Sequence, residues 1–352
     1  MFRHAGELAR RGHGVSLWAQ GSRPQVDWMD LSLPLRGFAV RSLPRCPPAD
    51  LCVFDRVRLA RPLWLAGRGI AVHFCQGFEG TDAELRMRSV RARRGIVLGL
   101  PKLCKLWWRH REIDRAYRLT TAKVVTHHHL GSLILRRFGQ PSYFVPYGLP
   151  TGVFTPPTRR PTDGRTVLIV GPTDVGWKRV TDALAAVRLL KQRKPDVRLI
   201  RVAQHPVRDV ERTLAVTDEY HSMLTAPEMA SLYRRADVLL LASDATEGFG
   251  LPLLEAMACG LACVVTDIPA FRTFARPDDY AYFAEVGDVQ GMAAAVERLL
   301  DSPAERERLG ARGLEVAAGY TMRRSCDTME EALTAIYGGK EERLGFNRPS
   351  AA

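Results

Sequence analysis

The stretch EGFGLPLLEAMACG carries two glutamates, Glu247 and Glu255, with seven residues between them. An apolar run at 238–242 predicts a strand before it, and a helix is expected from Gly250 onward, so the first backbone N–H groups of that helix are suited to bind phosphate. Gly248 and Gly250 let the main chain approach a ligand without a Cβ. One carboxylate can meet a ligand at the loop while the other accepts hydrogen bonds from vicinal hydroxyls. The pattern favours a phosphorylated, hydroxyl-rich ligand over two solvated helix carboxylates.

A cation stands at a second turn between a strand and a helix. Gly171 follows a predicted strand at 166–170, and Lys178 precedes a predicted helix at 179–193. Phosphate binding at such a turn commonly recruits a cation. Lys178 is therefore expected to contact phosphate, the alternative being a solvated lysine at a helix start.

Residues 166–329 resemble the retaining glycosyltransferases of GT-B fold, glycosyltransferase family 4, most specifically over 247–266. The resemblance implies that Glu255 binds the donor ribose and that Glu247 contacts the donor sugar. It assigns the remaining contacts with donor sugar and phosphate to the backbone of four residues, Gly248, Phe249, Gly250 and Leu251.

The stretch IVGPTDVGWKR resembles the family's other donor motif, a Gly-Arg pair followed by a lysine. Gly171 and Lys178 match the glycine and the lysine that neutralises the diphosphate, but Pro172 stands where the family has arginine. One of two expected cations is missing. The resemblance implies no cofactor and no obligatory metal, and the sequence has no Asp-x-Asp motif that would argue otherwise.

The stretch AVHFCQGFEG lies at a strand end where many relatives carry an active-site histidine. Gln76 and Glu79 follow this strand as they do in a rhamnosyltransferase-like branch, so Gln76 is expected to hydrogen-bond a sugar hydroxyl and Glu79 to orient the acceptor. His73 is either an acceptor-side residue or a core histidine. His127 and His128 end another strand, and at least one is expected to face the ligand. A zinc site is not expected, because adjacent histidines in an extended chain point opposite ways.

The chain has 352 residues and a formal net charge of +13, and that excess lies in one half. Residues 1–150 hold 25 Lys and Arg against 10 Asp and Glu, which leaves 26 against 28 for the rest. Eleven basic residues fall within 86–118, interleaved with apolar residues and two tryptophans. Such a segment suits an anionic membrane surface, or it is a surface helix with solvated arginines. Nucleic acid is a weaker reading, since no nucleic-acid-binding motif accompanies the charge.

Alternating strand and helix patterns predict parallel βαβ units throughout. We expect two Rossmann-like domains facing a cleft, the GT-B arrangement. The expected division is an acceptor-side domain at 1–150, a nucleotide-sugar-binding domain at 151–322, a helix at 323–337 crossing back to the first domain, and a tail at 338–352.

The beginning of the chain departs from the family pattern. The family opens with a buried strand and a glycine-rich loop, whereas MFRHAGELARRGHGVSLW already reads as the helix that follows them. We expect either an upstream start, which we favour, or a truncated protein, and lower stability and activity for the short form because the sheet would lose a strand.

No apolar run reaches the roughly 18–20 residues that span a bilayer, and the first residues do not form a secretory signal. The expected location is cytoplasmic, with a peripheral position at the inner membrane face. Seven cysteines without zinc-ligand spacing predict small buried residues in a reducing compartment.

The resemblance and the residues together predict an enzyme that moves a hexosyl or deoxyhexosyl unit from a nucleotide-diphosphate sugar to a glycan or lipid-linked acceptor, with retention, in cell-surface polysaccharide synthesis. Glu247, Lys178 and Gln76 are the expected catalytic residues. Two alternatives remain open: another GT-B enzyme, such as a nucleotide-sugar epimerase, and an inactive nucleotide-sugar-binding protein, which Pro172 makes plausible.

Overall fold

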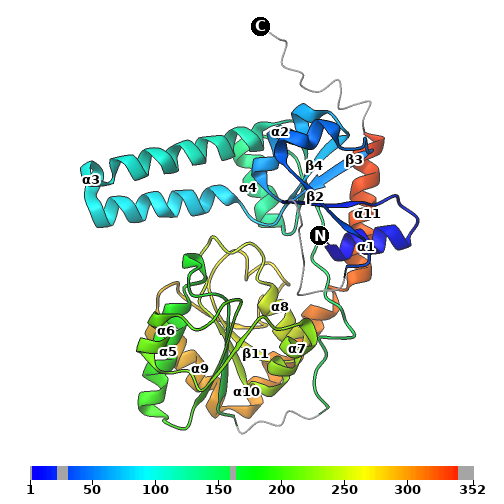
Figure 1. Ribbon diagram of the computed structural model, residues 1–352. Helices are drawn as coiled ribbons and strands as arrows, with labels where there is room; N and C mark the ends of the chain where they lie inside the picture. Colours follow the sequence, from blue (N-terminus) through cyan, green and yellow to red (C-terminus); the bar gives the residue numbers. More distant parts are fainter. Residues whose placement is uncertain (1, 22–30, 159–163, 340–352) are drawn as a thin grey trace. The chain divides into compact units, whose positions relative to one another are not determined.

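The computed structural model describes residues 2–21, 31–158 and 164–339 (Figure 1). The packing separates the chain into two units. The first unit is Met1–Pro146 together with Ser325–Ala352, and the second is Tyr147–Arg324.

The first unit is built on a four-stranded sheet in the order β3-β4-β5-β6, and β1 pairs with β2 in a separate two-stranded sheet. All of these strand pairs are parallel. The strand β2 was not expected, because LRGF holds only two apolar residues. The strands are β1 (Leu17–Gln20), β2 (Leu35–Phe38), β3 (Leu51–Phe54), β4 (Ile70–Cys75), β5 (Ala122–Val125) and β6 (Tyr143–Phe144). The helices are α1 (Phe2–Arg10), η1 (Val40–Arg45), η2 (Val57–Leu59), α2 (Ala60–Ala66), α3 (Glu79–Arg118) and α4 (His128–Phe138).

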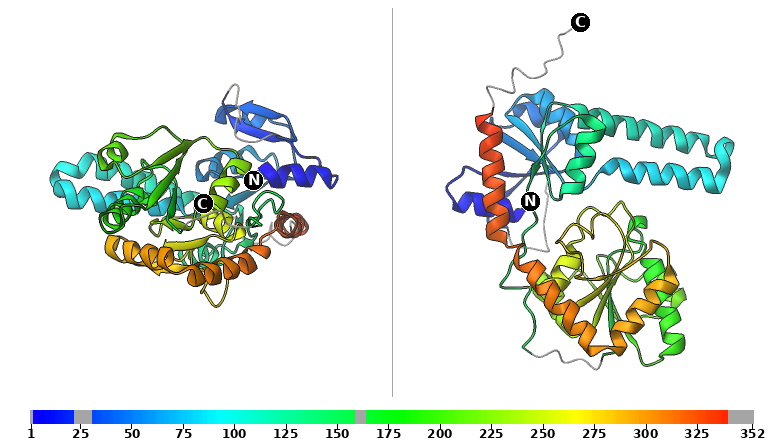
Figure 2. Two further views of the ribbon diagram at one scale, coloured as in Figure 1. Left: turned by 90° about the horizontal axis from the view of Figure 1, so that it is seen from below. Right: turned by 180° about the vertical axis from the view of Figure 1, so that it is seen from behind.

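The helix α3 doubles back on itself. A straight helix would separate Glu79 from Tyr117 by about 57 Å, yet the Tyr117 hydroxyl donates a hydrogen bond to Oε2 of Glu79 at 2.6 Å. Val90 packs against Leu103 and Leu106 in one apolar cluster. The segment therefore forms two arms, and Figures 1 and 2 show both arms extending away from the sheet. The arm that comes back to the sheet, residues 103–118, is called the returning arm below.

The second unit contains one six-stranded parallel sheet in the order β12-β11-β10-β7-β8-β9. The chain runs outward from β7 in one direction and from β10 in the other, so the strand order reverses between these two neighbours. Ligands of such sheets bind at the carboxyl ends of the strands at that reversal. The strands are β7 (Thr166–Val170), β8 (Arg198–Ala203), β9 (Glu219–Ser222), β10 (Val238–Leu241), β11 (Ala262–Thr266) and β12 (Tyr282–Ala284).

Helices cover both faces of this sheet. Leu168 and Leu239 face a core that includes α7 and α8, whereas Val167 and Leu240 face a core with α5 and α9. Both faces are apolar, as expected for a buried parallel sheet. The helices are η3 (Gly176–Lys178), α5 (Val180–Arg193), α6 (Asp209–Leu214), α7 (Ala226–Arg235), α8 (Leu251–Ala258), α9 (Val289–Asp301) and α10 (Pro303–Ala318).

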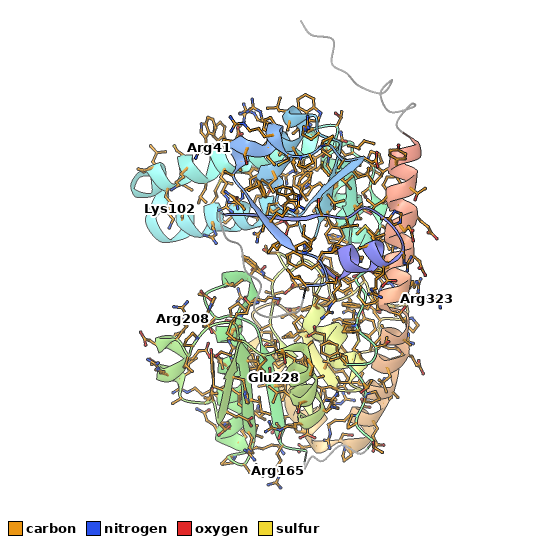
Figure 3. The ribbon with its side chains drawn as sticks, turned by 45° about the vertical axis from the view of Figure 1, so that its right-hand side comes forward. Arg41, Lys102, Arg165, Arg208, Glu228 and Arg323 are labelled. Carbon is orange, nitrogen blue, oxygen red and sulfur yellow. The ribbon has the colours of Figure 1, made fainter. Side chains whose placement is uncertain are left out.

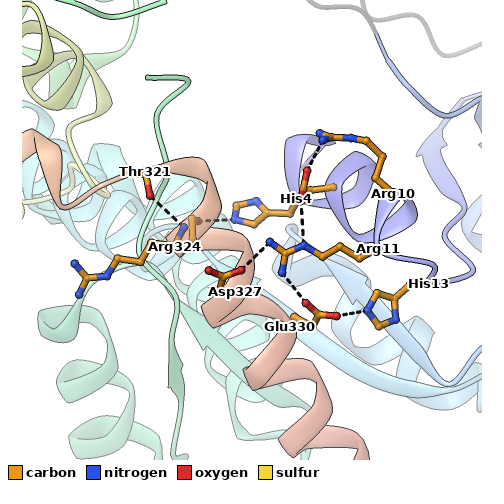
Figure 4. Close-up of polar contacts among 10 residues, drawn as sticks. His4, Arg10, Arg11, His13, Thr321, Arg324, Asp327 and Glu330 are labelled. Carbon is orange, nitrogen blue, oxygen red and sulfur yellow. Dashed lines mark hydrogen bonds and ion pairs between the residues drawn. The ribbon is translucent and has the colours of Figure 1, made fainter. Parts of the chain in front are cut away.

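The last helix, α11 (Met322–Gly338), begins in the second unit and belongs to the first unit from Ser325 onward. The Ser325 hydroxyl lies 2.7 Å from Nε2 of His4 and donates to the Pro146 carbonyl at 2.5 Å. Arg11 forms ion pairs with Asp327 at 2.7 Å and Glu330 at 2.6 Å (Figure 4). These contacts attach α11 to α1 within the first unit.

All seven cysteines are free thiols. Four of them are buried, as expected for small core residues. The expectation was wrong for Cys104, which is exposed on α3, and only partly right for Cys46 and Cys52, which are half-buried.

Candidate functional site

Two loops of the second unit meet at the reversal of strand order. Gly171 follows β7 with φ +129°, and a Cβ at this position would lie 3.6 Å from Cδ of Lys178. The Asp244 N–H, after β10, donates to the Trp177 carbonyl at 2.8 Å. This bond ties the loop that carries Lys178 to the loop that carries Glu247.

Lys178 and Glu247 form a nearly buried ion pair. Nζ of Lys178 lies 2.6 Å from Oε2 of Glu247, and the two side chains are 19% and 9% exposed. The Ser243 hydroxyl donates to the same carboxylate oxygen at 2.9 Å. An ammonium group has three donors, so Lys178 can hold Glu247 and still donate to phosphate oxygens.

Gly250 makes the sharp turn into α8. Its φ is +87°, and a Cβ would lie 2.5 Å from Cε1 of the buried Phe271. Only glycine fits both constraints. No side chain caps this helix start. Pro252 has no N–H, and the Leu253 N–H donates to the Gly250 carbonyl at 2.9 Å. The Leu251 N–H at the start of α8 therefore suits an anion.

Glu255 and Phe249 lie on either side of this turn in sequence. The fully buried Tyr233 of α7 donates to Oε2 of Glu255 at 2.9 Å, which fixes the carboxylate one turn into α8. The Phe249 ring packs edge-on against Tyr147 and Phe274. Its side chain is therefore a core group, and only its backbone is available for the predicted donor contact.

The predicted acceptor-side residues of the first unit differ in accessibility. Gln76 is exposed just after β4. His73 is fully buried, stacks on Phe54 at 4.8 Å, and burial lowers its pKa to about 3. Of the two alternatives for His73, the structure favours the core histidine. Glu79 accepts hydrogen bonds from the Val57 N–H at 3.2 Å and from Tyr117.

The two adjacent histidines occupy the start of α4 rather than an extended strand. Nδ1 of the buried His127 accepts a hydrogen bond from the Leu130 N–H at 3.2 Å and so caps the helix. His128 is exposed and stacks on Phe144 at 3.9 Å. His127 therefore has a structural role in this unit, and His128 is the more accessible of the pair.

Part of the second unit matches a known protein family. The family described as "Glycosyl transferases group 1" matches residues 164–302. The matched residues 164–302 are called the group 1 domain below. This segment holds Lys178, Glu247 and Glu255.

Two curated relatives illustrate the match of the group 1 domain. Phosphatidyl-myo-inositol mannosyltransferase of Mycolicibacterium smegmatis is 35% identical over 163 residues, which cover 46% of this chain and 42% of that protein. N-acetyl-alpha-D-glucosaminyl L-malate synthase of Bacillus anthracis is 31% identical over 142 residues, covering 39% of this chain and 37% of that protein. The chain spans about half the length, or less, of the curated relatives that it matches.

Solved structures show that the chain has the GT-B fold. Sucrose-phosphate synthase from Thermosynechococcus elongatus superposes with a TM-score of 0.75 and 17% identity, covering 96% of this chain and 92% of that one. Anabaena HepE, solved with UDP and glucose, gives a TM-score of 0.65 and 13% identity, covering 86% of each chain. The predicted pair of parallel, Rossmann-like sheets is confirmed.

The group 1 domain also contains a buried arginine that the sequence reading missed. Arg201 of β8 is fully buried, donates to the carbonyl of Gly171 at 2.5 Å and to the Thr173 hydroxyl at 3.1 Å, and pairs with Glu211 at 3.1 Å. Burial lowers its pKa. The guanidinium thus holds the loop that contains Pro172, the position of the missing cation. The available signal was the second arginine of the strand RLIRVA, which lies between apolar residues.

Within the part of the chain that the structure describes, no three His, Cys, Asp or Glu side chains are grouped to hold a metal ion. No helix of the described residues is long and apolar enough to cross a membrane.

Proposed function

We propose that this protein transfers a sugar from a nucleotide-diphosphate sugar to a glycan or lipid-linked acceptor, with retention at the anomeric carbon, in cell-surface polysaccharide synthesis. The group 1 domain and its curated relatives, which transfer mannosyl and N-acetylglucosaminyl groups by their names, support glycosyl transfer. We propose that the activity is that of glycosyltransferase family 4, on the resemblance of residues 166–329 to that family.

The single observation that carries the proposal is the ion pair between Lys178 and Glu247 beside the start of α8. Lys178 and the Leu251 N–H at the start of α8 bind the diphosphate and stabilise the charge that develops on it as it departs. Glu247, held by Lys178 and Ser243, contacts the donor sugar.

Glu255 binds the ribose of the donor. Its carboxylate is oriented by Tyr233, and a carboxylate with a second acceptor oxygen suits vicinal hydroxyls. Arg201 holds the Gly171–Thr173 loop in place through its hydrogen bonds. It stabilises the loop in which Pro172 replaces the expected arginine, but it does not supply a second exposed cation.

Glycosyl transfer proceeds through an oxocarbenium-like transition state. In the proposed front-face mechanism, the bond from the anomeric carbon to the diphosphate breaks, the acceptor oxygen attacks the same face, and the departing diphosphate takes the acceptor proton. Gln76 hydrogen-bonds a hydroxyl of the sugar. No metal is required in this scheme.

An anionic membrane surface is the proposed site of action at the cytoplasmic face. On α3, Trp107 and Trp108 are 49% and 61% exposed, and Lys102 and Lys105 are exposed beside them. Exposed tryptophans next to basic side chains suit the headgroup region of an anionic bilayer. The name of the Mycolicibacterium smegmatis relative includes a phosphatidylinositol acceptor, which supports a lipid-linked acceptor here.

The test is a panel of nucleoside diphosphates and their sugars screened by thermal shift. A ligand at a hundred times its Kd raises the free energy of unfolding by about 2.7 kcal/mol. We expect one nucleotide to stabilise the protein, Glu255→Ala to abolish this shift, and the control Lys194→Ala, at a half-buried lysine of the same unit, to retain it. An unchanged shift for Glu255→Ala would contradict the donor site. Epimerised donor without any transfer would favour the epimerase alternative.

A further inference from the structure

The first unit contains a cavity of about 930 Å³ between η2, α2 and the returning arm of α3. The charged part of its lining is mostly basic. Two glutamates, Glu79 and Glu112, also line it. Its basic residues are Arg56, Arg58, Arg61, Arg109 and Arg115.

The two glutamates neutralise only part of this basic charge. Glu112 pairs with Arg115 at 2.5 Å. Both oxygens of Glu79 are occupied by the Val57 N–H and the Tyr117 hydroxyl, and burial raises the pKa of this carboxyl. Glu79 therefore joins η2 to both ends of α3 and supports the cavity wall.

Arg58 and Arg61 have no ion-pair partner among the residues that the structure describes. Both are exposed to solvent at the cavity. Gathering guanidinium groups around one cavity is unfavourable until an anion binds. Guanidinium groups bind phosphate through paired hydrogen bonds, in a planar geometry that lysine cannot provide.

The rest of the cavity is apolar, and a second cavity adjoins it. The first is lined between the arginines by apolar residues, namely Val57, Pro62, Ile113, Ala116 and Leu119. The second, of about 400 Å³, shares Arg61 and Pro62 with the first and extends along η1 and α2. Leu65 lines it and is 64% exposed. Figure 3 labels Arg41, which lies on η1 at this second cavity, and Lys102, which lies on α3.

We propose that these joined cavities bind a phosphate ester that carries an apolar chain, with the phosphate between Arg58 and Arg61 and the chain along Leu65. The basic lining binds the phosphate. The apolar groove binds the chain, so a phosphate ester with an apolar chain is preferred to a soluble sugar phosphate. Binding itself requires no catalysis. The further step, that this ligand is the acceptor, rests on the proposed function.

The test uses two soluble probes with the same headgroup, dihexanoylphosphatidic acid and glycerol 3-phosphate, each titrated calorimetrically into the full chain. We expect the phosphatidic acid to bind at least about tenfold more tightly, because its chains bury apolar surface. Arg58→Gln/Arg61→Gln should weaken both probes by at least about tenfold. The matched control Arg3→Gln/Arg136→Gln removes two exposed charges from the same unit and should leave both affinities unchanged.

Two further variants distinguish the contribution of the apolar chain to the affinity from that of the phosphate. Leu65→Asn should remove the advantage of phosphatidic acid and leave glycerol 3-phosphate unaffected, and Arg58→Lys/Arg61→Lys should restore only part of the binding. The proposal would be overturned if Arg58→Gln/Arg61→Gln and Arg3→Gln/Arg136→Gln lost the same affinity for the probes. Equal affinities of the two probes for the wild type would overturn it as well. Glu255→Ala should retain the phosphatidic acid while losing nucleotide, so failure of the donor site and failure of this cavity give different results.

Discussion

Nζ of Lys178 lies 2.6 Å from Oε2 of Glu247, although the two residues are 69 positions apart and follow different strands. The strand reversal between β7 and β10 brings them together. Each side chain partly compensates the other's burial. In the proposed function, the pair lies where the diphosphate and the sugar of the donor meet.

Removing the ammonium should affect nucleotide binding more than folding. Lys178→Ala is expected to weaken nucleoside diphosphate binding by about ten- to a hundredfold, because a charge-assisted hydrogen bond to phosphate is lost. Isothermal calorimetry measures the change. The control is Lys194→Ala, which breaks an exposed ion pair with Asp301 in the same unit. Equal affinities for the two variants would exclude Lys178 from the phosphate site.

Arg201 should contribute strongly to stability. Arg201→Met leaves Glu211 buried without its cation, and the free energy of unfolding is expected to fall by about 3–5 kcal/mol. The double variant Arg201→Met/Glu211→Leu should recover a large part of this loss, since both charges are then absent. Urea denaturation followed by circular dichroism tests this coupling. Additive losses in the double variant would show that the pair is not coupled.

Gly250→Ala should destabilise the second unit. The positive φ and the contact with Phe271 both oppose a Cβ, so the expected cost exceeds about 1 kcal/mol. Gly152→Ala is the control, because a Cβ there meets nothing within 4 Å. A melting temperature for Gly250→Ala equal to that of the control would contradict the strained turn.

His73 should make the fold sensitive to acid. Its pKa is lowered from 6.5 to about 3 by burial, so between these values the unfolded chain binds a proton that the folded chain does not. His73 imposes no cost in stability above pH 6.5. As the pH falls from 6.5 toward 3, the free energy of unfolding decreases by about 1.4 kcal/mol per pH unit. His73→Phe, which keeps a ring beside Phe54, should flatten the dependence of unfolding free energy on pH. The exposed His128→Phe is the control, and an unchanged slope in His73→Phe would refute the assignment.

The sequence predicted the elements with long apolar patterns accurately. The strand expected at 166–170 has these bounds in the structure, the strand expected at 238–242 is β10 (Val238–Leu241), and the helix expected at 179–193 is α5 (Val180–Arg193). Their apolar patterns reflect burial on known faces. Short strands with mixed sequences, such as β9 (EYHS) and β12 (YFA), lacked this signal.

Contacts between distant positions were harder to predict. The placement of Lys178 and Glu247 at neighbouring strand ends follows from the motifs, but their ion pair depends on the strand order. The return of α3 to Glu79 and the convergence of arginines from η2, α2 and α3 depend on tertiary packing. Local pattern contains no information on such distances.

The most direct test of the central claim compares sugar transfer and donor binding in Glu247→Gln. With the donor identified by thermal shift, the wild type should release nucleoside diphosphate and form a product whose anomeric configuration, measured by NMR, matches that of the donor. Glu247→Gln should bind the nucleoside diphosphate within about threefold of wild type while kcat falls by at least about a hundredfold. Unchanged kcat in this variant, or an inverted product from the wild type, would contradict the account.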